Sequence, residues 1–104
     1  MNVKTTTETN QSVSEVITKV AQNYGITFEA LVGKNRLAKY VWPRQIAMYF
    51  LREYLHLPYS LIASIIGDRN HTTIMYGYQK VKHKLRENVV MRRVLDDLWK
   101  KIIE

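Results

Sequence analysis

Apolar residues recur with the spacing of an α-helix between Ile74 and Leu85, and this stretch constrains the fold more than any other. The apolar positions follow the order i, i+3, i+4, i+7 and i+11: Ile74, Gly77, Tyr78, Val81 and Leu85. The spacing predicts one helix with a single apolar stripe. Because such a stripe must be covered, this helix has to pack against the core of a domain.

The opposite side of the same predicted helix carries polar, aromatic and basic side chains. At about 100° per residue, the side chains that project away from the stripe are those of Thr72, Tyr76, Gln79, Lys80 and His83. No acidic residue occurs between Arg69 and Arg86, although a solvated helix face usually carries carboxylates too. Short hydrogen-bonding groups, aromatic rings and cations are what a DNA groove accepts. The pattern therefore favours a DNA-reading helix.

The positive charge of the chain is concentrated in two segments. Residues 34–52 hold five cations and no acid, and residues 69–86 hold five more, again with no acid. The whole chain has 16 basic and 9 acidic residues, so the remainder carries 6 basic and 9 acidic residues and a charge of −3. Two separate basic segments are typical of a surface that binds a polyanion.

The composition excludes several classes of protein. A length of 104 residues fits one domain with a modest core. No run approaches the roughly 18 apolar residues of a membrane helix, and the first ten residues lack the apolar centre of a secretory signal. The absence of cysteine excludes disulfides, thiolate metal sites and a cysteine nucleophile, and it fits a reducing cytoplasm.

The chain divides into a polar start and one helical domain. We expect residues 1–11, which are Thr-rich and without periodicity, to be a flexible tail or linker, and residues 12–104 to be the domain. Ser12 to Glu15 has the form of a capping box and predicts the start of the first helix, which Gly25 ends. A short helix follows from Ile26 to Gly33, and a last one is expected from about Val89 to Ile103.

The middle of the chain predicts a loop and then a buried helix. Residues 34–41 have no helical stripe and are expected to form a loop, and Pro43 suits the first position of the next helix. That helix, from about Pro43 to His56, is apolar nearly all round and should lie at the centre of the domain. Its one polar strip consists of Arg44, Gln45 and Arg52.

Two helices around a short turn predict a helix-turn-helix. The first spans Tyr59 to Ile66 and turns Ile62, Ala63 and Ile66 inward, and Gly67 begins the turn. Asn70 is expected to cap the second helix. The residues at the start of that helix are the ones such a motif presents to base edges.

With these residues placed, the chain resembles the C-terminal DNA-binding domain of the bacterial replication initiator DnaA. The family signature is close to Gly-x-Arg-Asp-His-Thr-Thr-Val and stands here as Gly67 to Ile74. A second match is Pro43 to Met48, and a third is the basic loop Lys34-Asn35-Arg36. The resemblance covers about residues 13–103 and implies an all-α fold of about six helices with a central helix-turn-helix, similar to that of the Trp repressor.

The resemblance also implies a division of labour. Arg36 would enter the minor groove, and Asn70, His71 and Thr72 would read bases in the major groove. The positions where the family holds phosphates are Lys34, Arg44, Gln45, Arg52, Tyr59, Ser60, Arg69, Thr73, Tyr76 and Lys80. Contacts to phosphates give affinity and register but no sequence information.

Departures from the family pattern bear on the preferred site. Asn70 stands in place of an aspartate, and an amide suits adenine where a carboxylate suits the N4 amino group of cytosine. Asp68 stands where glycine is common, Trp42 replaces a typical arginine, and the loop is less basic at Asn35, Leu37 and Ala38. We therefore expect DNA binding with an altered preference at one base pair or more.

Nothing in the sequence indicates an enzyme, a metal site or another cofactor. There is no G-x-x-x-x-G-K-[ST] loop, so the sequence fits an excised domain or a free-standing small protein without ATPase activity. We expect binding to double-stranded DNA at a site like a DnaA box, in an origin or an operator, by a chain that is monomeric on its own. The alternatives are a module that contacts replication-initiation proteins and a free-standing transcriptional regulator.

Overall fold

The computed structural model describes the backbone of residues 3–67 and 69–104 and the side chains of residues 12–67 and 69–104. The described chain forms six α-helices and no strand. Their bounds are α1 Val3–Asn23, α2 Phe28–Val32, α3 Ala38–Glu53, α4 Tyr59–Ile65, α5 His71–Glu87 and α6 Val89–Ile103. The expected all-α fold with about six helices is therefore confirmed.

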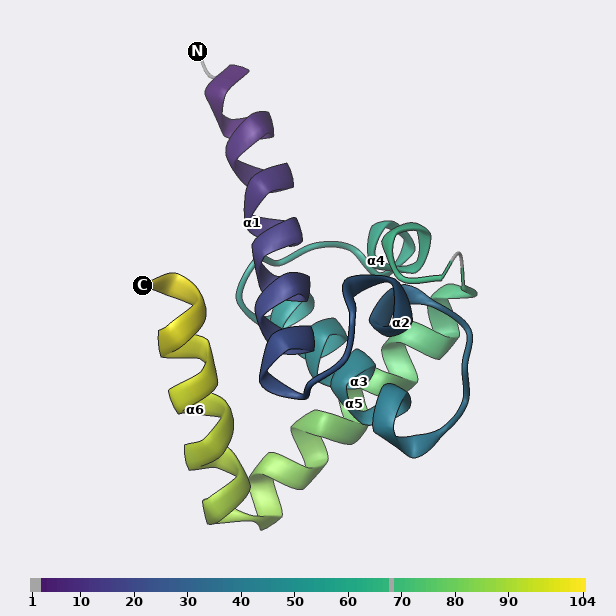
Figure 1. Ribbon diagram of the computed structural model, residues 1–104, viewed down its shortest axis with the longest axis vertical. Helices are drawn as coiled ribbons and strands as arrows, with labels where there is room; N and C mark the ends of the chain where they lie inside the picture. Colours follow the sequence, from purple (N-terminus) through teal and green to yellow (C-terminus); the bar gives the residue numbers. More distant parts are fainter. Residues whose placement is uncertain (1–2, 68) are drawn as a thin grey trace.

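Helix α3 lies at the centre, as its sequence predicted. Every residue from Pro43 to Leu51 is buried, and α1, α2, α4 and α5 all pack against this helix. Helix α6 packs against α1 and α5, and the N-terminal turns of α1 extend beyond the other helices (Figure 1). None of the described helices combines the length and the apolar character that crossing a bilayer requires.

Two helices begin earlier than the sequence predicted. Helix α1 starts at Val3, so the expected start at Ser12 is wrong, while the division between linker and domain at residues 11 and 12 stays a prediction. Helix α3 starts at Ala38, so Pro43 lies inside it. A proline there removes one helical hydrogen bond, from residue 43 to the carbonyl of Lys39. Because Lys39 is exposed, water can serve this carbonyl instead.

The end of α1 and the start of α2 agree with their capping residues. Gly25 has a φ of +68°, and Gly25 and Ile26 donate their backbone N–H groups to Gln22 and Ala21, which closes α1 with a Schellman motif. Thr27 caps α2 by accepting a hydrogen bond from the Ala30 backbone N–H at 3.0 Å. In α6, Leu95, Leu98 and Ile102 are buried, whereas Val94 is 45% exposed.

The predicted helix-turn-helix is formed by α4, the turn that begins at Ile66 and Gly67, and α5. Gly67 has a φ of +73°, and Asn70 is the N-cap of α5, as expected. All five residues of the predicted stripe on α5 are buried. A Cβ atom at Gly77 would lie 2.5 Å from the Met48 sulfur, so the missing side chain lets α5 approach α3 closely.

Candidate nucleic-acid interface

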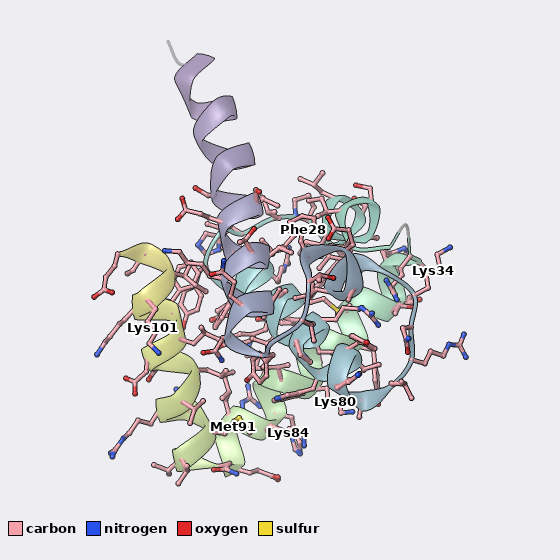
Figure 2. The ribbon with its side chains drawn as sticks, in the orientation of Figure 1. Phe28, Lys34, Lys80, Lys84, Met91 and Lys101 are labelled. Carbon is pink, nitrogen blue, oxygen red and sulfur yellow. The ribbon has the colours of Figure 1, made fainter. Side chains whose placement is uncertain are left out.

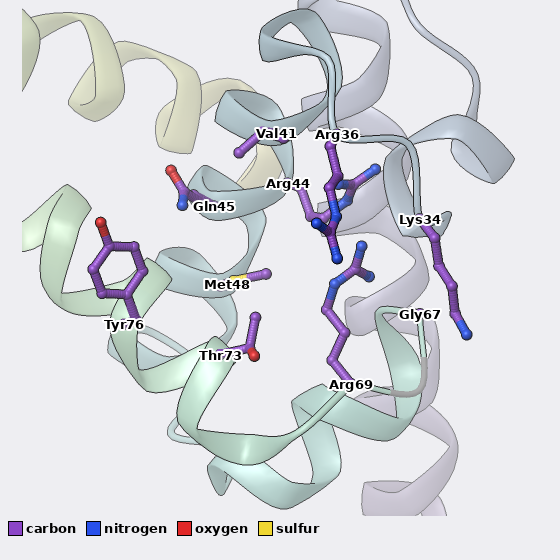
Figure 3. A pocket seen from close by; sticks show the side chains of 10 residues that line it. All are labelled: Lys34, Arg36, Val41, Arg44, Gln45, Met48, Gly67, Arg69, Thr73 and Tyr76. Carbon is purple, nitrogen blue, oxygen red and sulfur yellow. The ribbon is translucent and has the colours of Figure 1, made fainter.

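A groove of about 440 Å³ lies where four segments of the chain meet: the loop after α2, the first half of α3, the turn of the helix-turn-helix and the first turns of α5. The described lining residues contribute four cations and no carboxylate (Figure 3). They are Lys34, Arg36, Val41, Arg44, Gln45, Met48, Gly67, Arg69, Thr73 and Tyr76. A basic hollow attracts anions.

The groove gathers seven of the fourteen residues that the sequence singled out, from segments up to 42 positions apart (Lys34 to Tyr76). Asn70, His71 and Thr72 are exposed at the start of α5, next to the groove. Lys80 is exposed further along α5, whereas Arg52, Tyr59 and Ser60 lie at the end of α3 and the start of α4. Lys34 projects beside the loop, Lys80 and Lys84 project from α5, and Lys101 projects from α6 on the other side of the view (Figure 2).

Arg44, which the family resemblance places among the phosphate contacts, is buried. Its side chain is only 3% exposed, and its guanidinium donates to three backbone carbonyls. The nitrogen–oxygen distances are 2.6 Å to Leu31, 2.9 Å to Asn35 and 3.1 Å to Ala30. Burial lowers the pKa of Arg44, and the positive charge of Arg69 lowers it further. The group that sequence reasoning assigned to a phosphate therefore holds the end of α2 and the loop behind it.

Gln45 is also buried, with 8% of its surface exposed, and its expected contact with a phosphate stays a prediction. It lines the groove, where Figure 3 shows its amide beside the ring of Tyr76. Its Oε1 atom is buried and has no hydrogen-bond partner among the described residues. A buried amide oxygen without a partner is costly, so this residue gains from any donor that enters the groove.

Arg69 is half-buried and bridges two segments. It donates from Nη1 to the Ile66 carbonyl at 3.0 Å and from Nη2 to the Gly33 carbonyl at 2.8 Å. Burial lowers its pKa, and the neighbouring Arg36 lowers it further. Arg36 itself is exposed, and its guanidinium faces those of Arg44 and Arg69 in Figure 3. Sequence reasoning listed Arg69 with the phosphate ligands and missed these carbonyl partners.

The start of α5 combines a helix cap with exposed polar groups. The Asn70 Oδ1 atom accepts from the Thr72 backbone N–H at 2.9 Å and from the Thr72 hydroxyl at 2.7 Å. The cap leaves the Asn70 amide nitrogen and the Thr72 methyl group for other contacts. His71 is exposed beside them. This end of the helix therefore presents a donor, an imidazole and a methyl group on one surface.

The other edge of the interface consists of aromatic and basic side chains packed together. Arg52 donates to the Leu57 carbonyl at 3.1 Å, and its guanidinium lies 4.3 Å from the centre of the Tyr59 ring. The Tyr78 hydroxyl donates to Glu53 at 2.6 Å. Burial and the Glu53 carboxylate raise the pKa of Tyr78 to about 12. Arg52 and Tyr59 are thus held in place before any ligand arrives.

Several aromatic side chains near the interface have a structural role. Trp42 packs against the core, with the Lys84 ammonium 5.3 Å from its ring centre. Phe50 is fully buried and Tyr49 nearly so, as predicted, whereas Tyr54 is 37% exposed and stacks on Trp99 at 4.3 Å. Among the side chains that the structure describes, no three His, Asp or Glu groups lie close enough to hold a metal ion.

Sequence reasoning did not include three residues that line the groove among the site residues: Val41, Met48 and Gly67, the last of which it placed in the turn. Met48 stands one helical turn after Arg44, so its place on the same side of α3 could have been inferred from their spacing. Val41 lies in the segment expected to be a loop, and its position became clear only once α3 was seen to start at Ala38.

The fold and the groove together define a helix-turn-helix domain with a basic surface at the start of its second helix. Residues 13–81 match the family described as the bacterial dnaA protein helix-turn-helix. The chain belongs to this family. Membership supports DNA binding.

Relatives named chromosomal replication initiator protein DnaA agree with this result. The protein of Lactococcus lactis subsp. cremoris is 35% identical over 92 residues, which cover 88% of this chain and 20% of the relative. That of Corynebacterium jeikeium is 41% identical over 87 residues, covering 84% of this chain and 15% of the relative. The chain therefore spans about one fifth or less of the length of these proteins.

Proposed function

We propose that this chain binds double-stranded DNA in a sequence-specific way through the groove and the start of α5. The observation that carries the proposal is the basic groove, with four cations among its described lining residues, beside an exposed helix start. In this arrangement the start of α5 enters the major groove, and Asn70, His71 and Thr72 face base edges. Arg36, on the neighbouring loop, reaches the adjacent minor groove.

Exposed groups around the helix start supply the phosphate contacts in this proposal. Thr73, Tyr76 and Lys80 follow one another along α5 with helical spacing, and all three are exposed. Lys34 stands on the loop side, and Tyr59 and Ser60 stand at the N-terminus of α4. Contacts on both sides of the recognition helix fix its register on the duplex.

The preferred site is a sequence like a DnaA box, in a replication origin or an operator. The names of the relatives support a part in replication initiation. ATP hydrolysis is not part of the proposed function, since the sequence contains no P-loop motif.

The hydrogen bonds of Asn70 sharpen the expected preference. Its Oδ1 atom already accepts two hydrogen bonds from Thr72, so pairing with adenine through both amide atoms would weaken the helix cap. The amide nitrogen is the free group, and it donates. We propose that Asn70 reads a base acceptor, whereas an aspartate would offer a second oxygen to the cytosine amino group.

A salt titration tests DNA binding directly. If about six phosphates are neutralised, the slope of log K against log salt should be near −5. A random-sequence duplex and a duplex with a DnaA box are titrated by fluorescence anisotropy. No duplex binding at low salt, or binding that does not change with salt, would contradict the proposal.

The substitution Asn70→Asp tests the reading of bases. The variant keeps an oxygen for the helix cap and exchanges the free donor for an acceptor. We expect sites selected from a random duplex library to change at one base pair, with a preference shift of about 1–3 kcal/mol. Identical selected sites for both proteins would mean that Asn70 only caps α5.

A module that contacts replication-initiation proteins is the second candidate. Exposed apolar side chains beside the interface favour it: Leu37 is 59% exposed and Tyr76 is 64% exposed. The salt titration separates the two functions, because a protein-binding module has no need of a steep salt dependence on random duplex. A free-standing transcriptional regulator would share the DNA-binding surface and differ in the sites that it selects.

A further inference from the structure

The loop between α2 and α3 is fixed from one side by a buried side chain. Arg44 donates to the Asn35 carbonyl within the loop and to the Ala30 and Leu31 carbonyls in α2. Within the loop, the Asn35 side chain accepts from the Leu37 backbone N–H at 2.9 Å. These bonds join the loop to α3, but none of them joins it to the helix-turn-helix.

Arg69 supplies the connection to the helix-turn-helix. One arm of its guanidinium donates to Ile66 at the end of α4, and the other donates to Gly33, 36 residues away, at the start of the loop. Its backbone N–H also donates to the Ala63 carbonyl at 2.9 Å, which fixes the point from which the side chain leaves. One side chain therefore spans from the turn before α5 to the loop that carries Arg36.

The turn leaves room for this connection only because residue 67 is glycine. A Cβ atom at Gly67 would collide with the Arg69 guanidinium and lie 2.9 Å from the Val32 carbonyl. The φ of +73° at this position also favours glycine. Gly67 and Arg69 thus act as a pair, in which the absence of one side chain makes space for the other.

We propose that Arg69 is a positioning residue that sets Arg36 relative to the start of α5. The inference rests on the proposed function and deepens it. Major-groove and minor-groove contacts on one duplex have to be in register, and the described bonds from Arg69 join the two segments that would make them. A guanidinium suits this role because its fork of donors reaches two carbonyls at once.

The substitution Arg69→Lys separates positioning from phosphate binding. Lysine keeps the charge but lacks the planar fork. If Arg69 positions Arg36, the variant loses about tenfold in affinity for the selected site while its salt slope stays within one unit of that of the wild type. Near wild-type affinity for the lysine variant would overturn the inference, since a phosphate ligand needs only the charge.

A double-mutant cycle provides the second readout. We expect Arg36→Ala to weaken binding about tenfold in the wild type and less than threefold in the Arg69→Lys background, because a displaced loop no longer delivers Arg36. Lys80→Ala is the matched control: Lys80 is an exposed cation on α5, so its effect should multiply with that of Arg36→Ala. Multiplicative effects in both pairs would overturn the inference.

Failure of this inference can be told apart from failure of the proposed function. A wild type that binds no duplex overturns the proposed function, whereas binding with a multiplicative Arg36–Arg69 pair overturns the positioning role alone. Circular dichroism checks that each variant is folded. If Arg69→Lys does not fold, Arg69→Gln takes its place, since its amide still donates to one carbonyl, and the same cycle decides.

Discussion

The cations around the groove fall into two groups: some are exposed to a ligand, and others stabilise the fold. Lys34, Arg36 and Lys80 are exposed, and their charge is free to meet a ligand. Arg44 and Arg69 are wholly or partly buried, and their donors are bonded to carbonyls of the chain itself. Both groups come from the same acid-free segments of the sequence.

This difference shows what a count of charges can and cannot tell. An acid-free basic segment correctly indicated where the basic surface lies. It did not indicate which cations face outward, because all carbonyl partners of Arg44 and Arg69 except Ile66 lie 9 to 36 positions away in the sequence. In an arginine, the fork of donors can stabilise a fold while its charge adds to the field of the surface.

The largest expected effect of a substitution is at Arg44. Arg44→Lys keeps the charge and leaves at least two buried carbonyls without a donor, so we expect a loss of about 2–4 kcal/mol in the free energy of unfolding. Urea denaturation measures it. The matched control is Lys39→Ala, an exposed cation on the same helix, which should change stability by no more than about 0.5 kcal/mol. Equal effects at the two positions would remove the distinction between the groups.

An intermediate effect is expected at Arg52, which has one carbonyl partner and lies over the Tyr59 ring. Arg52→Lys should cost about 1 kcal/mol, because it weakens one hydrogen bond and one cation–π contact. The control is Arg86→Lys, the same replacement of arginine by lysine at an exposed position near the end of α5. If Arg52→Lys lowers the free energy of unfolding as much as Arg44→Lys does, burial does not determine how much each arginine contributes to stability.

The smallest effect on stability is expected at Lys80. Lys80→Ala should leave the free energy of unfolding within about 0.5 kcal/mol of the wild-type value and weaken binding to all duplexes alike, with the salt slope reduced by about one. Anisotropy titrations on two unrelated duplexes measure both quantities. Weakened binding to only one of the duplexes would place Lys80 among the base-reading residues.

The helices were predictable wherever residues close together in the sequence determine the structure. The apolar spacing on α5 gave its buried face residue by residue, and Gly25, Thr27 and Asn70 marked helix ends through hydrogen bonds within a few positions. The starts of α1 and α3 were missed because their signals conflict. A Thr-rich segment has low helix propensity, and proline is most often found in the first turn of a helix.

The candidate site was predictable in part, for a similar reason. The exposed start of α5 follows from helical geometry, so Thr72, Tyr76 and Lys80 were placed correctly on the outer face. Arg44 and Gln45 were expected to contact phosphates from the family resemblance, but both are buried because α3 is enclosed on nearly all sides. Burial of a polar residue depends on partners from other elements, and the pattern within one helix does not contain them.

Selection of bound sites from a random duplex library shows whether the start of α5 reads the sequence. We expect wild-type protein to enrich a site like a DnaA box. We expect His71→Ala and Thr72→Ala, at exposed positions outside the core, to lose this enrichment while keeping binding to random duplex. Their loss should correspond to about 1–3 kcal/mol at the preferred site. No enrichment by the wild type, or unchanged enrichment by both variants, would contradict the claim that the start of α5 reads the sequence.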